Sequence, residues 1–231
     1  MTAVVIIPAR LASTRLPNKL LLNETGRPLI YHTIKAASPL INVVVATQDQ
    51  EIYSALKDHV NVIMTGDCKS GTERVRACLN SEFVAGHDVI INWQADEPEL
   101  DCYHATSLLE EIDRSGVDIA TLAAPATKEE YLSPDVVKTV LDHKNFAMYF
   151  SRCSIPFGDP TRALKHIGLY AFRRASLSKW VLRETTYPSE SLEQLQWLQE
   201  GLKIKVCIGA VKYAGIDTRE EYDAFVKRHA I

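Results

Sequence analysis

Residues 4–19 read VVIIPARLASTRLPNK, an apolar run followed by a polar loop with three cationic side chains. The run at 4–8 is short, uninterrupted and mostly β-branched, which predicts a strand buried on both faces. Residues 28–37 follow with the spacing of an amphipathic helix and a proline in its first turn. A buried strand, a loop and a helix in this order predict the first unit of a parallel sheet.

The same alternation of apolar runs and amphipathic stretches continues to about residue 125. The predicted strands are residues 43–46, 61–64, 88–92 and 119–124. The predicted helices are residues 49–57, 71–80 and 103–112. Strands that alternate with helices imply right-handed crossovers and a mostly parallel sheet covered on both faces. The sequence therefore predicts an α/β fold.

The pattern changes after Pro125. Residues 136–141 and 146–150 flank a short polar turn, which predicts a β-hairpin, and 166–172 and 204–208 are further strands. Helices are predicted at 192–199 and 218–227, the second capped by Thr218 with Glu221 three residues later. We predict a single domain over 1–231 with a small β-rich insertion, a mixed sheet, and approximate insertion bounds of 126–165.

Composition narrows the class of protein. The chain has 231 residues, a formal net charge of −3 and 46% hydrophobic residues. Charges are spread along the chain, so we expect no nucleic-acid partner, and no apolar run is long enough to span a bilayer, so we expect no membrane partner. The five cysteines form no C-x-x-C pair. Reduced thiols and the absence of a signal-peptide pattern predict a cytoplasmic protein.

The loop after the first strand lies where parallel α/β sheets bind ligands. It contains neither the G-x-G-x-x-G pattern of dinucleotide enzymes nor the G-x-x-x-x-G-K-[ST] pattern of P-loop ATPases. Its cations and hydroxyls are suitable partners for several phosphate oxygens. From composition alone, a phosphate-binding loop and a solvated polar loop remain equally open.

Motifs along nearly the whole chain resolve this ambiguity. They are IPAR at 7–10 with Leu16, Pro17 and Lys19, VAT at 45–47, MT at 64–65, SGTER at 70–74, QADEP at 94–98, YFSR at 149–152 with Ile155 and Pro156, HIGLY at 166–170, LEQL at 192–195 and GIDT at 215–218. In this order they resemble the 3-deoxy-manno-octulosonate (Kdo) cytidylyltransferases, relatives of the acylneuraminate cytidylyltransferases.

The resemblance implies a fold and an activity. The fold would be the three-layer αβα, Rossmann-like nucleotidyltransferase type. The reaction would transfer CMP from CTP to the anomeric hydroxyl of an acidic 3-deoxy sugar, most directly Kdo, and release pyrophosphate for lipopolysaccharide synthesis. It further implies Mg²⁺ as cofactor and a homodimer, with the 126–165 segment near the acceptor and the dimer contact.

The resemblance also assigns roles to residues of this chain. Asp96 and Asp217 match metal ligands, and with Arg10 and Lys19 they form the expected catalytic set. The nucleotide-binding positions it implies are Arg10, Leu11, Ala12, Ser13, Arg15, Lys19, Ser70, Arg74 and Gln94. The sugar-binding positions it implies are Gln94, Arg152, His166, Tyr170, Glu193 and Gln194. We expect Gln94 and Asp96 on one strand face, and His166 and Tyr170, four apart on one strand, on another.

The chain departs from the family pattern at a few positions. Ala95 replaces the glycine of the Gln-Gly-Asp-Glu-Pro motif after an unusual Trp93, which we expect to reshape the pocket, and Asn18 replaces a loop glycine. The segment from Pro156 to His166 is short. These differences leave open another ulosonic acid, an amino analogue or a phosphonate as acceptor. Two other classes of protein compete with this interpretation. A non-catalytic binding protein is disfavoured because the charged residues are retained, and a nicotinamide oxidoreductase is disfavoured because the glycine pattern is missing.

Overall fold

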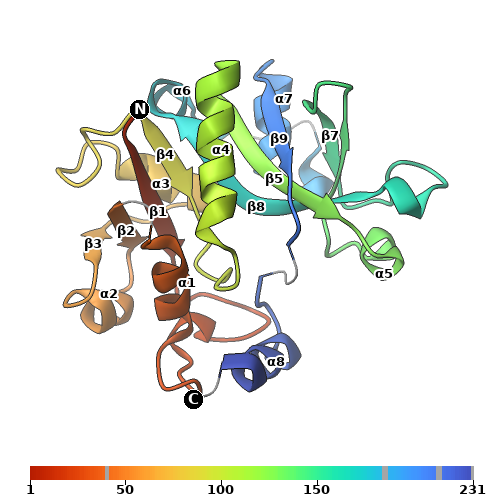
Figure 1. The fold of residues 1–231 in the computed structure, drawn as a ribbon. Helices are drawn as coiled ribbons and strands as arrows, with labels where there is room; N and C mark the ends of the chain where they lie inside the picture. Colours follow the sequence, from red (N-terminus) through yellow and green to blue (C-terminus); the bar gives the residue numbers. More distant parts are fainter. Residues whose placement is uncertain (40–41, 184–186, 212–214, 230–231) are drawn as a thin grey trace. The chain divides into compact units, whose positions relative to one another are not determined.

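The structure is a computed structural model that describes residues 1–39, 42–183, 187–211 and 215–229 (Figure 1). Contacts divide the chain into two compact units. The first comprises Met1–Tyr103 and Tyr213–Ile231, and the second comprises His104–Lys212.

The first unit is built on four parallel strands in the order β3-β2-β1-β4 (Figure 1). Their bounds are β1 Ala3–Ala9, β2 Asn42–Thr47, β3 Asn61–Met64 and β4 Val89–Asn92. β1 lies between β2 and β4, with Val5 opposite both Val43 and Ile91. Its side chains are almost completely buried, as expected for a central strand covered on both faces.

Helices follow these strands as the periodicity predicts. They are α1 Leu29–Ala37, α2 Gln50–Leu56, α3 Gly71–Ala77 and α8 Arg219–His229. α3 packs against β1 and β2, while α2 packs against β2 and β3. The predicted capping of the last helix is confirmed, because Glu221 N donates to Thr218 Oγ1 at 3.3 Å and Thr218 N donates to Glu221 Oε2 at 2.9 Å.

The second unit contains a mixed sheet. Its strands are β5 Ile119–Pro125, β6 Lys138–Leu141, β7 Ala147–Ser151, β8 Leu164–Arg173 and β9 Ile204–Ile208. β5 pairs antiparallel with β8 and parallel with β9, and β6 and β7 form the predicted hairpin. Its helices are α4 Cys102–Ser115, α5 Lys128–Leu132, α6 Arg174–Lys179 and α7 Glu193–Gln199.

The predicted α/β class is confirmed, and each predicted strand and helix is present within a few residues of its expected ends. Two short helices, α5 and α6, were not predicted, because five or six residues are too few to show a helical period. α5 did carry a start signal, since Thr127 and Glu130 form a capping box.

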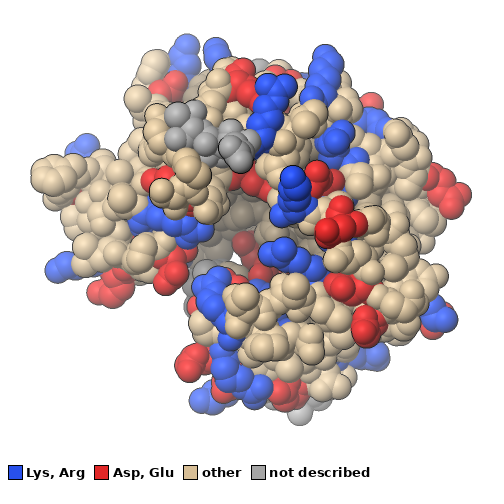
Figure 2. All heavy atoms as spheres, turned by 180° about the vertical axis from the view of Figure 1, so that it is seen from behind, with Lys and Arg blue, Asp and Glu red and all other residues tan. Residues whose placement is uncertain are grey.

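The surface carries mixed charge. Figure 2 shows Lys and Arg side chains interspersed with Asp and Glu over the face in view, in keeping with the small net charge. Within the part of the chain that the structure describes, no helix combines the length and the apolar character needed to cross a bilayer.

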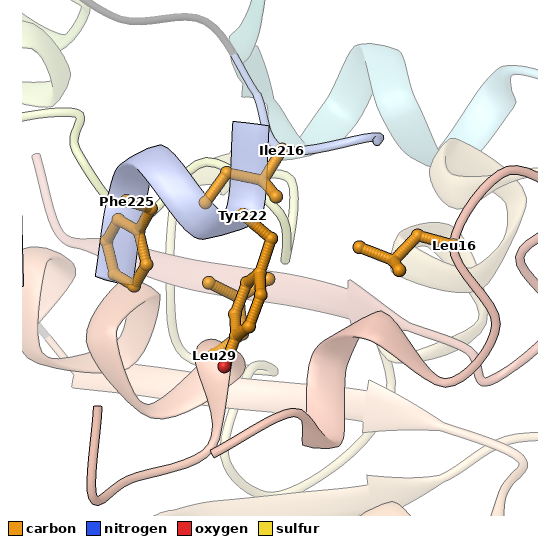
Figure 3. Packing of buried hydrophobic residues seen from close by; sticks show 5 residues of the cluster. All are labelled: Leu16, Leu29, Ile216, Tyr222 and Phe225. Atoms are coloured by element: carbon orange, nitrogen blue, oxygen red, sulfur yellow. The ribbon is translucent and has the colours of Figure 1, made fainter. Parts of the chain in front are cut away.

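A hydrophobic cluster fixes the last helix to the first unit (Figure 3). Tyr222 and Phe225 of α8 pack with Leu29 of α1, with Leu16 of the loop after β1 and with Ile216. The phenolic oxygen of Tyr222 bonds to Glu24, whose backbone N–H donates to it at 3.1 Å. The phenolic O–H also donates to the Glu24 carboxylate, and burial together with this second hydrogen bond raises the pKa of Tyr222 to about 12. The cluster matters for the site because Ile216 directly precedes Asp217.

Replacing Phe225 with alanine tests this anchor. Loss of a fully buried phenyl ring should lower the free energy of unfolding by about 3 to 5 kcal/mol, measured by urea unfolding. Lys227→Ala, on the exposed side of the same helix, should change it by less than about 0.5 kcal/mol. Equal losses in both variants would show that the cluster does not hold α8 in place.

Candidate active site

A cavity of about 300 Å³ lies in the first unit, at the carboxyl ends of its strands. The loop after β1, the turn before α3, the loop after β4 and the segment before α8 line it. It brings together the predicted residues Arg10, Ala12, Ser13, Arg15, Lys19, Ser70, Arg74, Gln94, Asp96 and Asp217. Its size and position are those of a small-molecule site.

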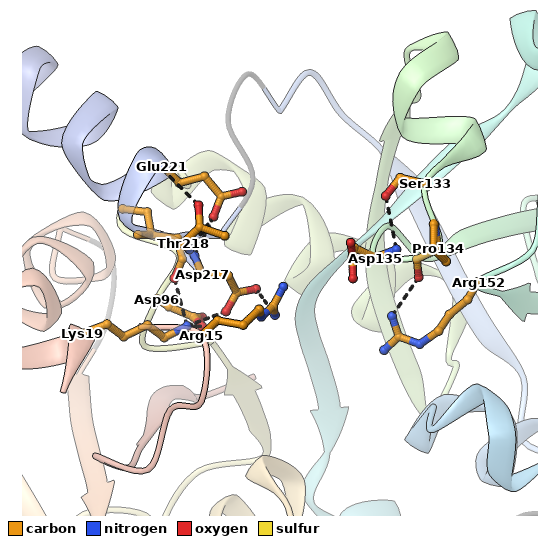
Figure 4. A network of polar contacts seen from close by, with 11 residues as sticks. Arg15, Lys19, Asp96, Ser133, Pro134, Asp135, Arg152, Asp217, Thr218 and Glu221 are labelled. Carbon is orange, nitrogen blue, oxygen red and sulfur yellow. Dashed lines mark hydrogen bonds and ion pairs between the residues drawn. The ribbon is translucent and has the colours of Figure 1, made fainter. Parts of the chain in front are cut away.

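Lys19 is the centre of the charged network in this cavity (Figure 4). Its Nζ donates to Asp96 Oδ2 at 2.5 Å, to Asp217 Oδ1 at 2.6 Å and to the Ile216 carbonyl at 2.9 Å. All three ammonium hydrogens therefore have an acceptor. Burial lowers the pKa of Lys19, but the two carboxylates outweigh it, so that the pKa is raised overall and the ammonium is charged.

The turn before Lys19 depends on Asn18. Its backbone is left-handed, with φ of 54° and ψ of 24°, in place of the glycine of the family pattern. Asparagine tolerates this conformation better than most residues. The turn is therefore preserved, and Lys19 begins a short 3₁₀ helix that ends at Leu21.

Asp96 and Asp217 are arranged as a carboxylate pair. One oxygen of each lies within 2.6 Å of the same lysine nitrogen, so a single cation can contact both. Mg²⁺ commonly takes one or two protein carboxylates and completes its shell with phosphate oxygens and water. Among the described residues, no cluster of three or more acidic, histidine or cysteine ligands occurs. The two carboxylates are groups of this cavity that could hold such an ion together with a phosphate ligand.

Two arginines add positive charge. Arg15 Nη2 donates to Asp217 Oδ2 at 2.6 Å, with about half of its side chain exposed. Arg10 is exposed at the end of β1 and forms no ion pair within the described parts of the chain. Arg10 is thus available to an anionic ligand, whereas Arg15 already neutralises a carboxylate.

Arg74 is a buried cation in the cavity wall, 3% exposed. Its guanidinium bonds to the Thr65 hydroxyl, to Gln48 Oε1 at 2.7 Å and to the Gly66 carbonyl at 3.5 Å. These partners are all neutral, so its charge is not cancelled by a carboxylate of the described chain and can act on a ligand. Sequence reasoning missed Gln48 and Thr65, although Thr65 lies within the MT motif.

Several sequence predictions need refinement. Ser70 caps α3, accepting from Glu73 N at 3.1 Å, while also lining the cavity. Gln94 and Asp96 both line the cavity but lie in the loop after β4, because the strand ends at Asn92; the shared strand face was wrong. Leu11 is not part of the lining, and its N–H donates to Asp49 Oδ2 at 2.7 Å.

Trp93 does not reshape the pocket by projecting into it. Its ring is fully buried outside the cavity lining, and its Nε1 donates to the Glu97 carbonyl at 3.1 Å. Ala95 does line the cavity, and its carbonyl accepts from Thr33 at 2.8 Å. The altered motif therefore leaves the carboxylate pair in place.

The second unit contains the predicted sugar-binding residues. Arg152 follows β7, and its guanidinium is held by carbonyls: Nε donates to Glu190 O at 3.0 Å and Nη1 to Pro134 O at 3.1 Å (Figure 4). Its Nη2 has no partner within the described residues. Two N–H groups thus orient the side chain and others can bind a ligand carboxylate.

His166 lies on β8 among aromatic rings, 5.3 Å from Tyr170 and 5.0 Å from Phe150 between ring centroids. The predicted shared face of His166 and Tyr170 is confirmed, despite a register shift between β5 and β8. Burial lowers the pKa of His166 to about 3, so its ring is neutral near pH 7.

The hydrogen bonds of His166 select its tautomer. Its Nε2 lies 3.0 Å from Thr121 Oγ1, and that hydroxyl donates to the Leu169 carbonyl at 2.9 Å. Because the hydroxyl has one hydrogen, it must accept from a protonated Nε2. Nδ1 then carries the lone pair and can accept a hydrogen bond from a sugar hydroxyl.

Glu193 and Gln194 begin α7. Gln194 is 5% exposed and its amide has no hydrogen-bond partner in the parts of the chain described. The amide can therefore donate to or accept from a polar ligand. Glu193 is half-buried and adds a second acceptor. Sequence reasoning missed Glu190, which holds Arg152 and has no motif of its own.

Comparison with known proteins identifies the family of the chain. The family model for cytidylyltransferases matches residues 4–208. A 3-deoxy-manno-octulosonate cytidylyltransferase of Glaesserella parasuis is 37% identical, over 96% of this chain and 95% of that protein. An 8-amino-3,8-dideoxy-manno-octulosonate cytidylyltransferase of Shewanella pealeana is also 37% identical, over 96% of each chain.

A solved structure extends the likeness to the fold. The structure of CMP:2-keto-3-deoxy-manno-octonic acid synthetase in complex with CTP superposes with a TM-score of 0.91 at 33% identity, over 100% of this chain and 99% of that one. The predicted nucleotidyltransferase fold is thereby confirmed. The chain belongs to the cytidylyltransferase family, in the group that contains the 3-deoxy-manno-octulosonate cytidylyltransferases.

Proposed function

We propose that this chain transfers CMP from CTP to the anomeric hydroxyl of Kdo. The sugar oxygen forms a bond to the α-phosphorus, the bond from that phosphorus to the β-phosphate oxygen breaks, and pyrophosphate leaves with a proton released from the hydroxyl. The observation that carries the proposal is the pair Asp96 and Asp217 on one lysine, in a cavity lined by further cations.

The residues of the cavity have distinct tasks in this reaction. Arg10, Arg15 and Lys19 supply positive charge for the triphosphate and the departing pyrophosphate. Asp96 and Asp217 are the residues that would hold Mg²⁺, which when bound neutralises phosphate charge. Ser70, Arg74 and Gln94 line the same wall and would contact the nucleotide. Phosphoryl-type transfer depends mainly on such positioning and charge.

The second unit would bind the acceptor sugar. Arg152 would bind the sugar carboxylate, and His166, Tyr170, Glu193 and Gln194 its hydroxyls. Two observations support this assignment: the ring of His166 is neutral, and the Gln194 amide has no hydrogen-bond partner in the described parts of the chain. The product chemistry fits lipopolysaccharide synthesis. We also propose a cytoplasmic homodimer, supported by five free cysteines and by exposed apolar side chains at Leu132, Met148 and Phe157.

An amino sugar is the second candidate acceptor. The observation that favours it is the equal identity, 37%, of the relatives that act on Kdo and on its 8-amino analogue. Pyrophosphate release with each acid separates the two. Activity with Kdo alone supports the first proposal, activity with the amino sugar alone replaces the acceptor, and release with neither from folded protein contradicts both.

Asp96→Asn and Asp217→Asn test the metal-binding pair. Each keeps the shape but removes a charge, so kcat should fall by about 100-fold or more in a Mg²⁺ titration of pyrophosphate release. CTP binding measured calorimetrically should lose its dependence on Mg²⁺. Asp223→Asn, an exposed carboxylate paired with Arg219, is the matched control and should behave like the unmodified protein. Retained Mg²⁺ dependence in both variants would contradict the assignment.

Arg152→Ala tests recognition of the acid. Loss of a charge-assisted contact that persists through the reaction should raise KM for Kdo about 100-fold while kcat changes little. Arg162→Ala removes an exposed arginine, paired with Asp159, from the same unit and should leave KM unchanged. An unaltered KM in Arg152→Ala would exclude Arg152 as the carboxylate partner.

The protonation of His166 is measurable by nitrogen NMR of the imidazole. Its signals should remain those of the neutral Nε2–H tautomer from pH 7 down to about pH 5, because the pKa in the folded state is lowered to about 3. Above the unfolded pKa of 6.5, His166 is neutral in both states and the free energy of unfolding does not depend on it. As the pH falls from 6.5 towards 3, the unfolded chain binds a proton that the folded ring does not, so the free energy of unfolding decreases. His166→Gln identifies the signal. Protonation above pH 6 would contradict this state.

A further inference from the structure

Lys138 of β6 is a completely buried lysine, 0% exposed, outside the residues assigned above. Its Nζ donates to the carbonyl oxygens of Ser133 at 2.7 Å, Val136 at 2.6 Å and Arg152 at 2.6 Å. It forms no ion pair with any carboxylate in the described chain. Burying a charge with neutral partners is costly, so an apolar residue would serve packing better at this position.

The three carbonyls belong to the frame around Arg152. One is the carbonyl of Arg152 itself. The other two belong to Ser133 and Val136, at the two ends of a four-residue segment that contains Pro134. The carbonyl of Pro134 accepts from Arg152 Nη1 at 3.1 Å. Figure 4 shows the Pro134 carbonyl facing the guanidinium, whereas Ser133 contacts Asp135. Lys138 thus binds both the backbone that carries Arg152 and the loop that receives its side chain.

Glu190 completes the frame. Its carboxylate accepts from Arg152 N at 2.8 Å and from Ser151 Oγ at 2.5 Å, and its carbonyl accepts from Arg152 Nε at 3.0 Å. Arg152 Nη2 is left without a partner in the described residues. Every contact on Arg152 therefore orients the guanidinium without cancelling its charge, since only the backbone N–H of Arg152 meets the carboxylate.

We propose that Lys138 is a positioning residue for recognition of the acidic sugar: its ammonium holds the 133–136 loop and the main chain of Arg152 so that the guanidinium meets the sugar carboxylate. The proposal rests on the proposed role of Arg152. Lys138 itself has all three N–H donors occupied and does not contact the sugar. Misplacement of a binding group by about 1 Å is enough to lose most of its effect.

Lys165 of β8 provides a matched control. It is the register partner of Lys138 between β6 and β8 and is also buried, at 6% exposed. Its Nζ binds Glu130 Oε1 at 2.6 Å and has no contact with Arg152. Lys138→Met and Lys165→Met therefore each remove a buried ammonium from adjacent strands, but only the first removes the support of Arg152.

The test is steady-state kinetics of pyrophosphate release, with CTP binding measured separately. Lys138→Met should raise KM for Kdo about tenfold, with kcat within about threefold and CTP affinity unchanged. Lys165→Met should leave KM for Kdo within about twofold. An unchanged KM in folded Lys138→Met, or equal increases in both variants, would overturn the proposal.

A double-mutant cycle separates positioning from general damage. In the Arg152→Ala background, Lys138→Met should have no further effect on KM for Kdo, because the group it positions is absent. Additive effects would overturn the proposal. If Arg152→Ala alone leaves KM unchanged, the proposed role of Arg152 fails; if only Arg152→Ala raises it, that role stands and the role of Lys138 fails.

A second variant covers the case in which Lys138→Met does not fold. Lys138→Gln keeps an uncharged amide that can donate two hydrogen bonds to the same carbonyls. It should fold with a thermal midpoint nearer the unmodified protein and should raise KM for Kdo less than Lys138→Met. A folded Lys138→Gln whose KM increase persists undiminished in the Arg152→Ala background would overturn the proposal.

Discussion

The contact of one lysine with two aspartates holds the candidate active site together. Asp96, Asp217 and Lys19 come from three loops that are distant in the sequence, and Lys19 Nζ is within 2.6 Å of both carboxylates. Two carboxylates that contact the same nitrogen would repel each other without the cation between them. The ammonium offsets this repulsion and holds one oxygen of each carboxylate near a single point, where both could contact a divalent cation. The packing of α8 holds Asp217 in place, because Ile216, the residue before it, belongs to the hydrophobic cluster that anchors this helix.

Buried lysines act differently in the two units. Lys19 meets carboxylates, so its charge is balanced inside the site. Among the described residues Lys138 donates to three carbonyls and to no carboxylate, so dipoles stabilise its charge and its contribution is geometric. His166 shows a third solution, since burial keeps it neutral and lets it act as an acceptor. In each unit the neighbours of a buried polar group thus decide whether it is charged and what it can bind. Both the transfer of a phosphoryl-type group and the binding of an acid depend on such placed charges.

Much of the fold could be predicted from the chain alone, because strand and helix periods are local properties. The wrong predictions for residues 93–96 have a local origin as well. Strand β4 stops at Asn92, so Gln94 and Asp96 reach the cavity from a loop, and Trp93 turns into the core. The periodicity of the sequence does not show where the strand ends or to which side the tryptophan points. Glu190, Gln48 and Lys138 escaped notice because their partners are distant in sequence, and only proximity gives them a role.

The sequence by itself determined the α/β class, the order of the elements, the family and most of the charged residues at the nucleotide cavity. These depend on residue type and spacing, which the chain displays directly. Tertiary structure alone decided how the charges are paired: Arg15 contacts Asp217, Arg74 lies among neutral groups, and Arg10 has no ion-pair partner among the described residues. It also decided the protonation of His166 and the orientation of Arg152. Such properties depend on burial and on distances between segments, which no linear pattern encodes.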